Sequence, residues 1–170
     1  RGLPLNLANT KDDYGNYSRD ESEYTKLLKN PDFWQNQTKA IDKKPTFHRA
    51  PNHREASIKR FRLINQGENL KDAFLKHDHK QIIKLQDQKI LPKKWYIQRN
   101  MRLISDKPSK TITSHCLDEL IHPTLDRAPT VREVARLQSF PDNYDFAGGP
   151  YLCPHIYETQ DKYEQIGDAV

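Results

Sequence analysis

Apolar residues recur at helical spacing in several short stretches of this 170-residue chain. The clearest pattern lies at 130–141, where Pro141 marks the end. Thr130 and Glu133 have the spacing of a capping box, in which each side chain satisfies a backbone N–H at the helix start. One side of this helix is apolar: Val131, Val134 and Ala135. The pattern therefore predicts a half-buried helix that ends near Gln138.

Weaker helical patterns occur elsewhere in the chain. The stretch 20–29 begins with acidic residues and ends with lysines, as a helix dipole favours. The stretch 52–64 places Ile58, Phe61 and Ile64 on one face, and Gly67 follows as a residue able to adopt left-handed backbone. Further helices are predicted at 68–92 and 161–166.

Two short segments have the composition of β-strands. Trp95–Ile97 is aromatic and Thr111–Thr113 is β-branched, and both residue types are enriched in strands. Short strands among short helices predict a fold of the α+β class. The apolar runs are only a few residues long, whereas a membrane-spanning helix needs roughly 20. The sequence therefore predicts no membrane partner.

The charge is concentrated in the middle of the chain. Residues 51–110 carry 15 Lys/Arg against six Asp/Glu, although the whole chain has a net charge of only +5. Residues 111–170 are net acidic, with four Lys/Arg against ten Asp/Glu. A basic stretch of this kind favours a polyanionic partner, most often nucleic acid. A solvated, lysine-rich surface explains the same composition equally well.

Residues for self-contained catalysis are sparse. The chain has two cysteines and seven histidines, and none of them has the spacing of a zinc site. Cys116 follows His115, but adjacency in sequence does not make a nucleophile–base pair, and a small buried residue is the simpler reading. No glycine-rich phosphate loop occurs. We expect a binding role, no metal and a reducing, cytoplasmic setting.

The C-terminal third contains three short motifs: PSKTIT at 108–113, REVARLQSFPD at 132–142 and QIGDAV at 165–170. In this order and spacing they resemble the C-terminal part of bacterial cytosine-5 DNA methyltransferases. They are similar to the end of the target recognition domain, the ninth conserved motif and the tenth conserved motif of that family. Residues 52–72 resemble the same recognition domain more loosely, and residues 1–50 match no pattern that we can name.

The resemblance implies a small, irregular α+β DNA-recognition lobe cut from a larger α/β methyltransferase. It divides the chain into a poorly matched segment (1–50), a target recognition region (51–128) and a segment that returns to the catalytic domain (129–170). The implied partners are double-stranded DNA and the catalytic domain of the same enzyme. The implied methyl donor is S-adenosylmethionine, and the implied setting is restriction-modification.

Charge and resemblance together suggest residues for DNA contact. These candidates are Arg60, Arg62, Arg99, Arg102, Ser109, Lys110, Thr111 and Thr113. Arg99 and Arg102 could read guanine through the guanidinium fork, and phosphate contact or a solvated charge is an open alternative. Thr111 and Thr113 match family threonines beside the extruded nucleotide, and strand packing is the alternative role.

The resemblance also has departures. Asp168, Ala169 and Val170 align with the family segment that lines the methyl-donor pocket, but the family usually has asparagine where this chain has Asp168. A carboxylate there would repel the carboxylate of the donor. The Pro-Cys nucleophile, the Glu-Asn-Val motif and the Phe-x-Gly-x-Gly loop are absent, and the nearest dipeptide is Cys153-Pro154. We therefore assign no catalytic residue and expect this chain alone to be inactive.

Two other functions stay open. The chain could be a non-catalytic, sequence-specific DNA-binding module or a degenerate methyltransferase remnant. It could also be an RNA-binding domain that stacks bases on Trp95, Tyr96 and Phe61, although the pattern around these rings favours burial.

Overall fold

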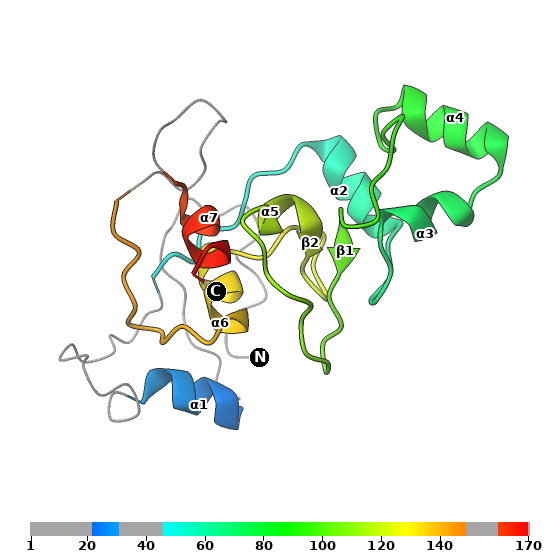
Figure 1. Cartoon of the computed structure of the whole chain (residues 1–170). Coiled ribbons are helices and arrows are strands. Elements are labelled where there is room, and N and C mark those ends of the chain that lie inside the picture. The colour runs from blue at the N-terminus through cyan, green and yellow to red at the C-terminus, as the bar shows by residue number, and fades with distance from the viewer. Residues whose placement is uncertain (1–21, 31–45, 149–159, 170) are drawn as a thin grey trace. The chain divides into compact units, whose positions relative to one another are not determined.

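The computed structural model of the chain describes residues 22–30, 46–148 and 160–169. It divides into two compact units (Figure 1). Unit 1 comprises Arg1–Ala50, Thr111–Cys116 and Pro129–Val170, and unit 2 comprises Pro51–Lys110 and Leu117–Ala128. Residues 111–116 thus belong to unit 1, whereas the resemblance placed them in the target recognition region, 51–128.

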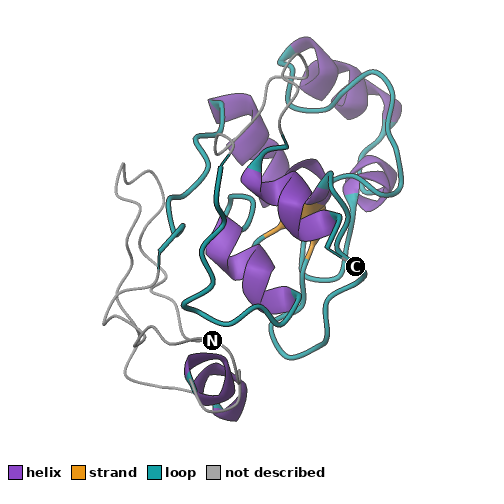
Figure 2. Ribbon diagram, turned by 60° about the vertical axis from the view of Figure 1, so that its left-hand side comes forward, coloured by secondary structure: helices purple, strands orange, loops and turns teal. Residues whose placement is uncertain are grey.

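Short helices joined by loops make up most of the described residues (Figure 2). The helices are α1 (Glu23–Lys29), α2 (Glu55–Arg62), α3 (Leu70–Leu75), α4 (His79–Asp87), α5 (Cys116–Glu119), α6 (Val131–Leu137) and α7 (Lys162–Gly167). The strands are β1 (Met101–Arg102) and β2 (Leu120–Ile121). The fold is therefore of the α+β class, as the sequence predicts.

Unit 2 is organised around one apolar cluster. Its buried members are Phe61, Ile64, Leu70, Ala73, Leu91 and Ile121. These residues come from α2, α3, β2 and the loops after α2 and α4, so the cluster fixes how these elements lie against one another. Burial of apolar side chains of this size contributes roughly 1.5–3 kcal/mol each.

The predicted helix at 68–92 is two helices, α3 and α4. Asn69 caps α3, and its side chain accepts a hydrogen bond from Lys71 N. Asp78 starts a new capping box for α4, with Gln81 as its partner. Because Asp78 has extended backbone at this cap, the first helix cannot continue through it.

The sheet of unit 2 is smaller than expected and lies elsewhere. β1 and β2 pair in parallel, with Met101 opposite Leu120 and Arg102 opposite Ile121. The predicted strands at 95–97 and 111–113 are wrong, because neither segment is paired in a sheet. Ile112 alone of the second segment is buried, and its backbone is irregular.

In unit 1, α6 and α7 pack side by side (Figure 1). The apolar face predicted for α6 is confirmed, because Val131, Val134 and Ala135 are completely buried. The predicted capping box is also confirmed: Thr130 Oγ1 accepts from Glu133 N, and Glu133 Oε2 accepts from Thr130 N. Tyr163 of α7 donates its hydroxyl to the carbonyl of Pro129, 3.0 Å away, and so fixes α7 at the start of α6.

The N-terminal helix α1 packs against the end of α6. Tyr24 donates its hydroxyl to the Arg136 carbonyl at 2.6 Å, and Asp142 N donates to the Leu28 carbonyl at 3.0 Å. The sequence predicts this helix at 20–29, and its first helical residue is Glu23. Asp142 also accepts from Arg136 Nε at 2.7 Å, so the turn after α6 is held by an ion pair.

Candidate nucleic-acid interface

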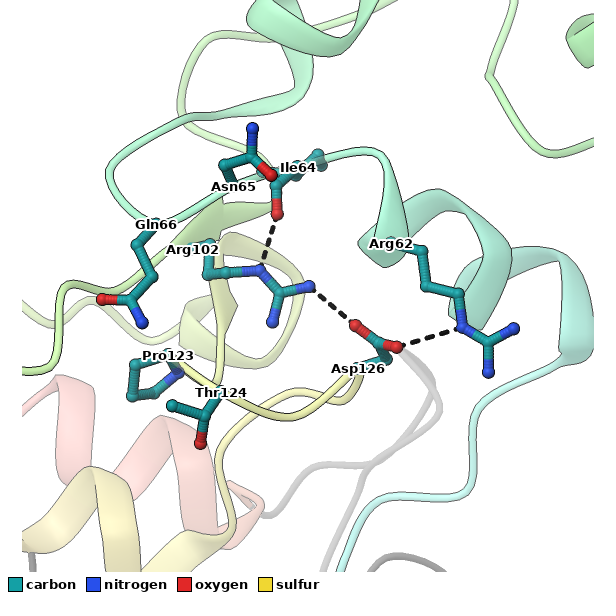
Figure 3. Close-up of a pocket in the computed structure, with 8 residues that line it drawn as sticks. All are labelled: Arg62, Ile64, Asn65, Gln66, Arg102, Pro123, Thr124 and Asp126. Carbon is teal, nitrogen blue, oxygen red and sulfur yellow. Dashed lines mark hydrogen bonds and ion pairs between the residues drawn. The ribbon is translucent and has the colours of Figure 1, made fainter.

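A polar pocket of about 390 Å³ opens on unit 2. It is lined by Arg62, Ile64, Asn65, Gln66, Arg102, Pro123, Thr124 and Asp126 (Figure 3). The residues come from the end of α2, the turn that follows it, β1 and the loop after β2. Segments far apart in the sequence therefore bring amide, guanidinium, hydroxyl and carboxylate groups to one place.

Arg102 forms the floor of this pocket and is not exposed. Its side chain donates to the carbonyls of Phe61, Ile64, His122 and Leu125 at 2.6–2.9 Å and to Asp126 Oδ1 at 2.8 Å. Only 6% of the residue is accessible to solvent. Every nitrogen of the guanidinium group thus has a protein acceptor, and the exposure that base reading would need is missing.

Asp126 links this buried arginine to the rim. Its second carboxylate oxygen accepts from Arg62 Nε at 3.0 Å (Figure 3). The Arg62 side chain is 66% exposed, so its guanidinium group lies on the open side of the pocket. Asp126 thereby holds Arg62 in a fixed direction.

Asn65 and Gln66 are exposed and line the same pocket, and the sequence patterns did not single them out. They stand in the turn before Gly67, which has the left-handed φ of +83° expected from the sequence. Gln66 Oε1 accepts from Ser105 N at 3.0 Å, which anchors its amide. The only signal in the sequence was two consecutive carboxamides next to a turn glycine, a pattern that turn formation already explains.

Arg60 and Arg99 differ in exposure. Arg60 is half-buried and donates Nε to the Ile90 carbonyl at 2.5 Å. Burial lowers the pKa of Arg60 below its ordinary value. Arg99 is exposed, and its guanidinium carbon lies 5.7 Å from the centre of the Tyr96 ring. Arg99 is therefore available to a ligand, whereas Arg60 mainly ties α2 to the loop after α4.

Ser109 and Lys110 lie at the end of unit 2. Ser109 Oγ donates to the Lys110 carbonyl at 2.9 Å. Lys110 Nζ pairs with Glu119 at 3.2 Å and donates to the Gln98 carbonyl at 3.3 Å. Both side chains are half-buried, and their polar groups bind neighbouring protein groups.

In unit 1 the threonine segment meets the end of α7. Thr111 is exposed, and Thr113 Oγ1 accepts from His115 N at 3.2 Å. Gly167 lies so close to this segment that a Cβ atom would stand 2.2 Å from Ser114 N and 2.3 Å from the Thr113 carbonyl carbon. The structure thus brings the 113–114 backbone together with the QIGD stretch, and Gly167 is required for that approach.

The predicted donor-pocket residues occupy the end of α7. Asp168 and Ala169 are exposed, and Val170 lies outside the described residues. Asp168 accepts from Gln160 Nε2 at 2.5 Å, which leaves one exposed acceptor edge. S-adenosylmethionine carries an ammonium group, a sulfonium, hydroxyls and a carboxylate, and a single acceptor fits only its donor groups. One acceptor does not by itself make a site for the methyl donor, and the assignment of Asp168 and Ala169 to a donor pocket stays a prediction.

Two histidines of the described segments contact backbone groups. His53 Nε2 accepts from Ala128 N at 3.0 Å, and His77 Nδ1 lies 2.7 Å from the Ala73 carbonyl. Burial, helped by the nearby charge of Arg127, lowers the pKa of His53, which keeps the ring neutral as this acceptor role requires. In the described segments, no group of three His, Cys, Asp or Glu side chains is placed to hold a metal ion.

The units differ in charge. Unit 2 carries 16 Lys/Arg and nine Asp/Glu, whereas unit 1 carries 12 and 14. The polar pocket therefore lies on the unit with a net charge of +7.

None of the described helices is long and apolar enough to cross a membrane.

Comparison with known proteins identifies one family over nearly the whole chain. The C-5 cytosine-specific DNA methylase family matches residues 5–170, which includes most of the segment that the sequence patterns left unassigned. The chain is 34% identical over 123 residues to the type II methyltransferase M.DdeI of Desulfomicrobium norvegicum, over 72% of this chain and 29% of that protein.

Two further relatives match shorter stretches. The type II methyltransferase M.AgeI of Thalassovita gelatinovora is 39% identical over 79 residues, which cover 44% of this chain and 16% of that protein. DNA (cytosine-5)-methyltransferase CMT2 of Oryza sativa is 47% identical over 60 residues, 35% of this chain and 4% of that protein. The chain spans less than a third of the length of these relatives. It belongs to the C-5 cytosine-specific DNA methylase family.

Proposed function

We propose that this chain is the DNA-recognition part of a DNA (cytosine-5)-methyltransferase that uses S-adenosylmethionine, in a restriction-modification system. Methyl transfer would then need the catalytic domain of the enzyme as a partner. The observation that carries the proposal is the polar pocket on the basic unit, together with the membership of the family.

The charge of unit 2 suits the DNA backbone. Cationic side chains that neutralise phosphates release counterions, and this contact is independent of sequence. Two exposed cations of unit 2 that suit this role are Lys59 and Arg99, with side chains 50% and 56% exposed. Thr111 and Thr113 would add hydroxyl contacts to a phosphate, beside the close approach of Gly167.

The pocket carries the side chains that read base edges. Asn and Gln pair with adenine, Arg pairs with guanine, and Asp accepts from the amino group of cytosine. Asn65, Gln66 and Arg62 are exposed on its rim, and the buried Arg102 holds the end of α2 and the following turn, which carry them. We therefore assign base reading to the rim and treat Arg102 as a positioning residue.

The experiment separates backbone contact from base reading. We expect Lys59→Glu/Arg99→Glu to weaken binding to every duplex alike and to flatten the salt dependence by about one slope unit for each lost phosphate contact. We expect Asn65→Ala/Gln66→Ala to relax sequence preference by roughly 5- to 100-fold at one or two positions, since a bidentate base contact contributes about 1–3 kcal/mol.

Both variants are measured by fluorescence anisotropy against a panel of duplexes at several salt concentrations. Lys26→Glu on α1 of unit 1 is the matched charge control, because that lysine is 56% exposed and pairs with Glu23 on the same helix. Duplex affinity that does not depend on salt, or equal loss in the control, would overturn the assignment of unit 2 to DNA.

A further inference from the structure

An aromatic segment of unit 2 is exposed although its composition favours burial. Trp95 is 40% exposed, Tyr96 57% and Ile97 58%. Their segment follows α4 and has no helical or strand structure. Large rings left in solvent at consecutive positions are uncommon on a small domain and mark interaction sites.

Contacts within unit 2 hold these rings in place. The Trp95 ring lies 6.2 Å from the ring of Phe74, which itself packs against the apolar cluster of the unit. Arg99 lies over one side of the Tyr96 ring. The backbone is tied at both ends, because Gln86 Nε2 donates to the Pro92 carbonyl at 3.1 Å and Lys110 Nζ donates to the Gln98 carbonyl. The rings are therefore preorganised for a ligand.

The charge around the rings indicates the kind of ligand. Residues 88–99 contain four cations and no Asp or Glu: Lys89, Lys93, Lys94 and Arg99. The three lysines are exposed. Arg99 forms a long ion pair with Asp118, with 3.9 Å between the nitrogen and the carboxylate oxygen. Protein interfaces are depleted in lysine, whereas sites for single-stranded nucleic acid combine aromatic rings with cations that follow the backbone.

We propose that Trp95 and Tyr96, with Lys93, Lys94 and Arg99, form a binding site for the unpaired bases of single-stranded DNA. The bases of a duplex are already stacked on both faces, but an unpaired base offers its face to an aromatic side chain. The site has no residue in common with the polar pocket. It shares Arg99 with the proposed phosphate contacts to duplex DNA, so its test changes Trp95, Lys93 and Lys94, which the duplex proposal does not use.

The test compares two oligomers of equal charge with the full chain. Labelled dT 20-mer and an abasic deoxyribose-phosphate 20-mer are titrated by fluorescence anisotropy. We expect the wild-type chain to prefer dT by at least fivefold. Trp95→Ala should weaken dT binding roughly 5- to 100-fold and leave binding of the abasic oligomer unchanged, as expected for the loss of one base–aromatic stack. Lys93→Ala/Lys94→Ala should weaken binding of both oligomers alike.

Two variants separate stacking from folding and from general apolar contact. Trp95→Leu keeps apolar bulk against Phe74 but has no aromatic face, and it should behave as Trp95→Ala does while keeping the wild-type melting temperature. Leu75→Ala removes an apolar side chain that is 72% exposed next to Phe74 and should change dT affinity less than twofold.

Intrinsic fluorescence gives a second readout. The chain has two tryptophans, so Trp34→Phe leaves Trp95 as the only one. Binding of dT should quench its emission, and the abasic oligomer should not. The proposal would be overturned if the wild-type chain bound both oligomers equally, or if Trp95→Leu bound dT as the wild type does. It would also be overturned if Trp95→Leu lost duplex binding as much as dT binding, or if the wild type bound a uridine 20-mer tenfold more tightly than dT.

Discussion

Arginine residues in this chain have opposite roles, and burial decides between them. Arg102 and Arg132 are almost completely buried, whereas the side chain of Arg62 is 66% exposed. Arg132 donates to the carbonyls of Pro141 and Tyr144 and lies 5.6 Å from two phenylalanine rings. The sequence could not separate these roles, because the acceptors of each guanidinium come from positions many residues away.

The first prediction at the residue scale concerns Arg102. Arg102→Ala should lower the free energy of unfolding by about 3–5 kcal/mol, because it removes one of the two arginine partners of Asp126 and leaves four carbonyls without their donor. Arg102→Lys should also destabilise the chain, since one ammonium group cannot reproduce the planar fork of donors. Urea denaturation followed by circular dichroism measures the change.

Arg99→Ala is the matched control for this measurement. Arg99 is exposed, with one long ion pair, and its loss should change stability by less than about 0.5 kcal/mol. If Arg102→Ala proves as stable as Arg99→Ala, the Arg102 guanidinium does not hold the surrounding segments together. That result would instead support direct contact of Arg102 with DNA.

At the scale of elements, the capping box of α6 was predicted correctly, whereas the strands expected from β-propensity were not. The box of Thr130 and Glu133 gave the start of α6, and acidic residues with terminal lysines gave α1. Trp95–Ile97 and Thr111–Thr113 have the side chains of strands but no pairing partner in the described part of the chain, where β1 pairs with β2. A cap is read from four consecutive residues, whereas pairing depends on distant ones.

Thr130 tests how far α6 depends on its cap. Its hydroxyl serves both Glu133 N and His48 Nδ1, 2.9 Å away, and the residue is completely buried. Loss of a cap costs about 0.5–2 kcal/mol, and the lost contact to a buried histidine costs about 1–3 kcal/mol more. Thr130→Ala should therefore lower the melting temperature by several degrees and leave the preferred DNA sequence unchanged.

Two variants make this prediction specific. Thr130→Ser keeps the oxygen and should retain most of the stability. Asp78→Ala removes the cap of α4, an exposed helix with no buried residue, and should cost only the capping contribution. A change in sequence preference with Thr130→Ala, at wild-type melting temperature, would show that α6 contacts DNA instead of organising unit 1.

At the scale of the whole molecule, three C-terminal motifs were enough to predict the family. The match of the family to residues 5–170 confirms that prediction. The same patterns could not predict that unit 1 combines residues 1–50 with 111–116 and 129–170. That grouping depends on long-range contacts such as Tyr24 with Arg136 and Gly167 with Ser114. Neither contact has a local sequence signal.

The last prediction concerns methyl transfer by the 170-residue chain. In the proposed enzyme a cysteine thiolate attacks a flipped cytosine, so the nucleophile must be accessible to the base. Cys116 is completely buried, and neither it nor Cys153 follows a proline. The chain alone should transfer no labelled methyl group from S-adenosylmethionine to DNA, while a family member with a Pro-Cys sequence serves as positive control. Incorporation that is lost in Cys116→Ala or Cys153→Ala would show that the chain carries its own nucleophile.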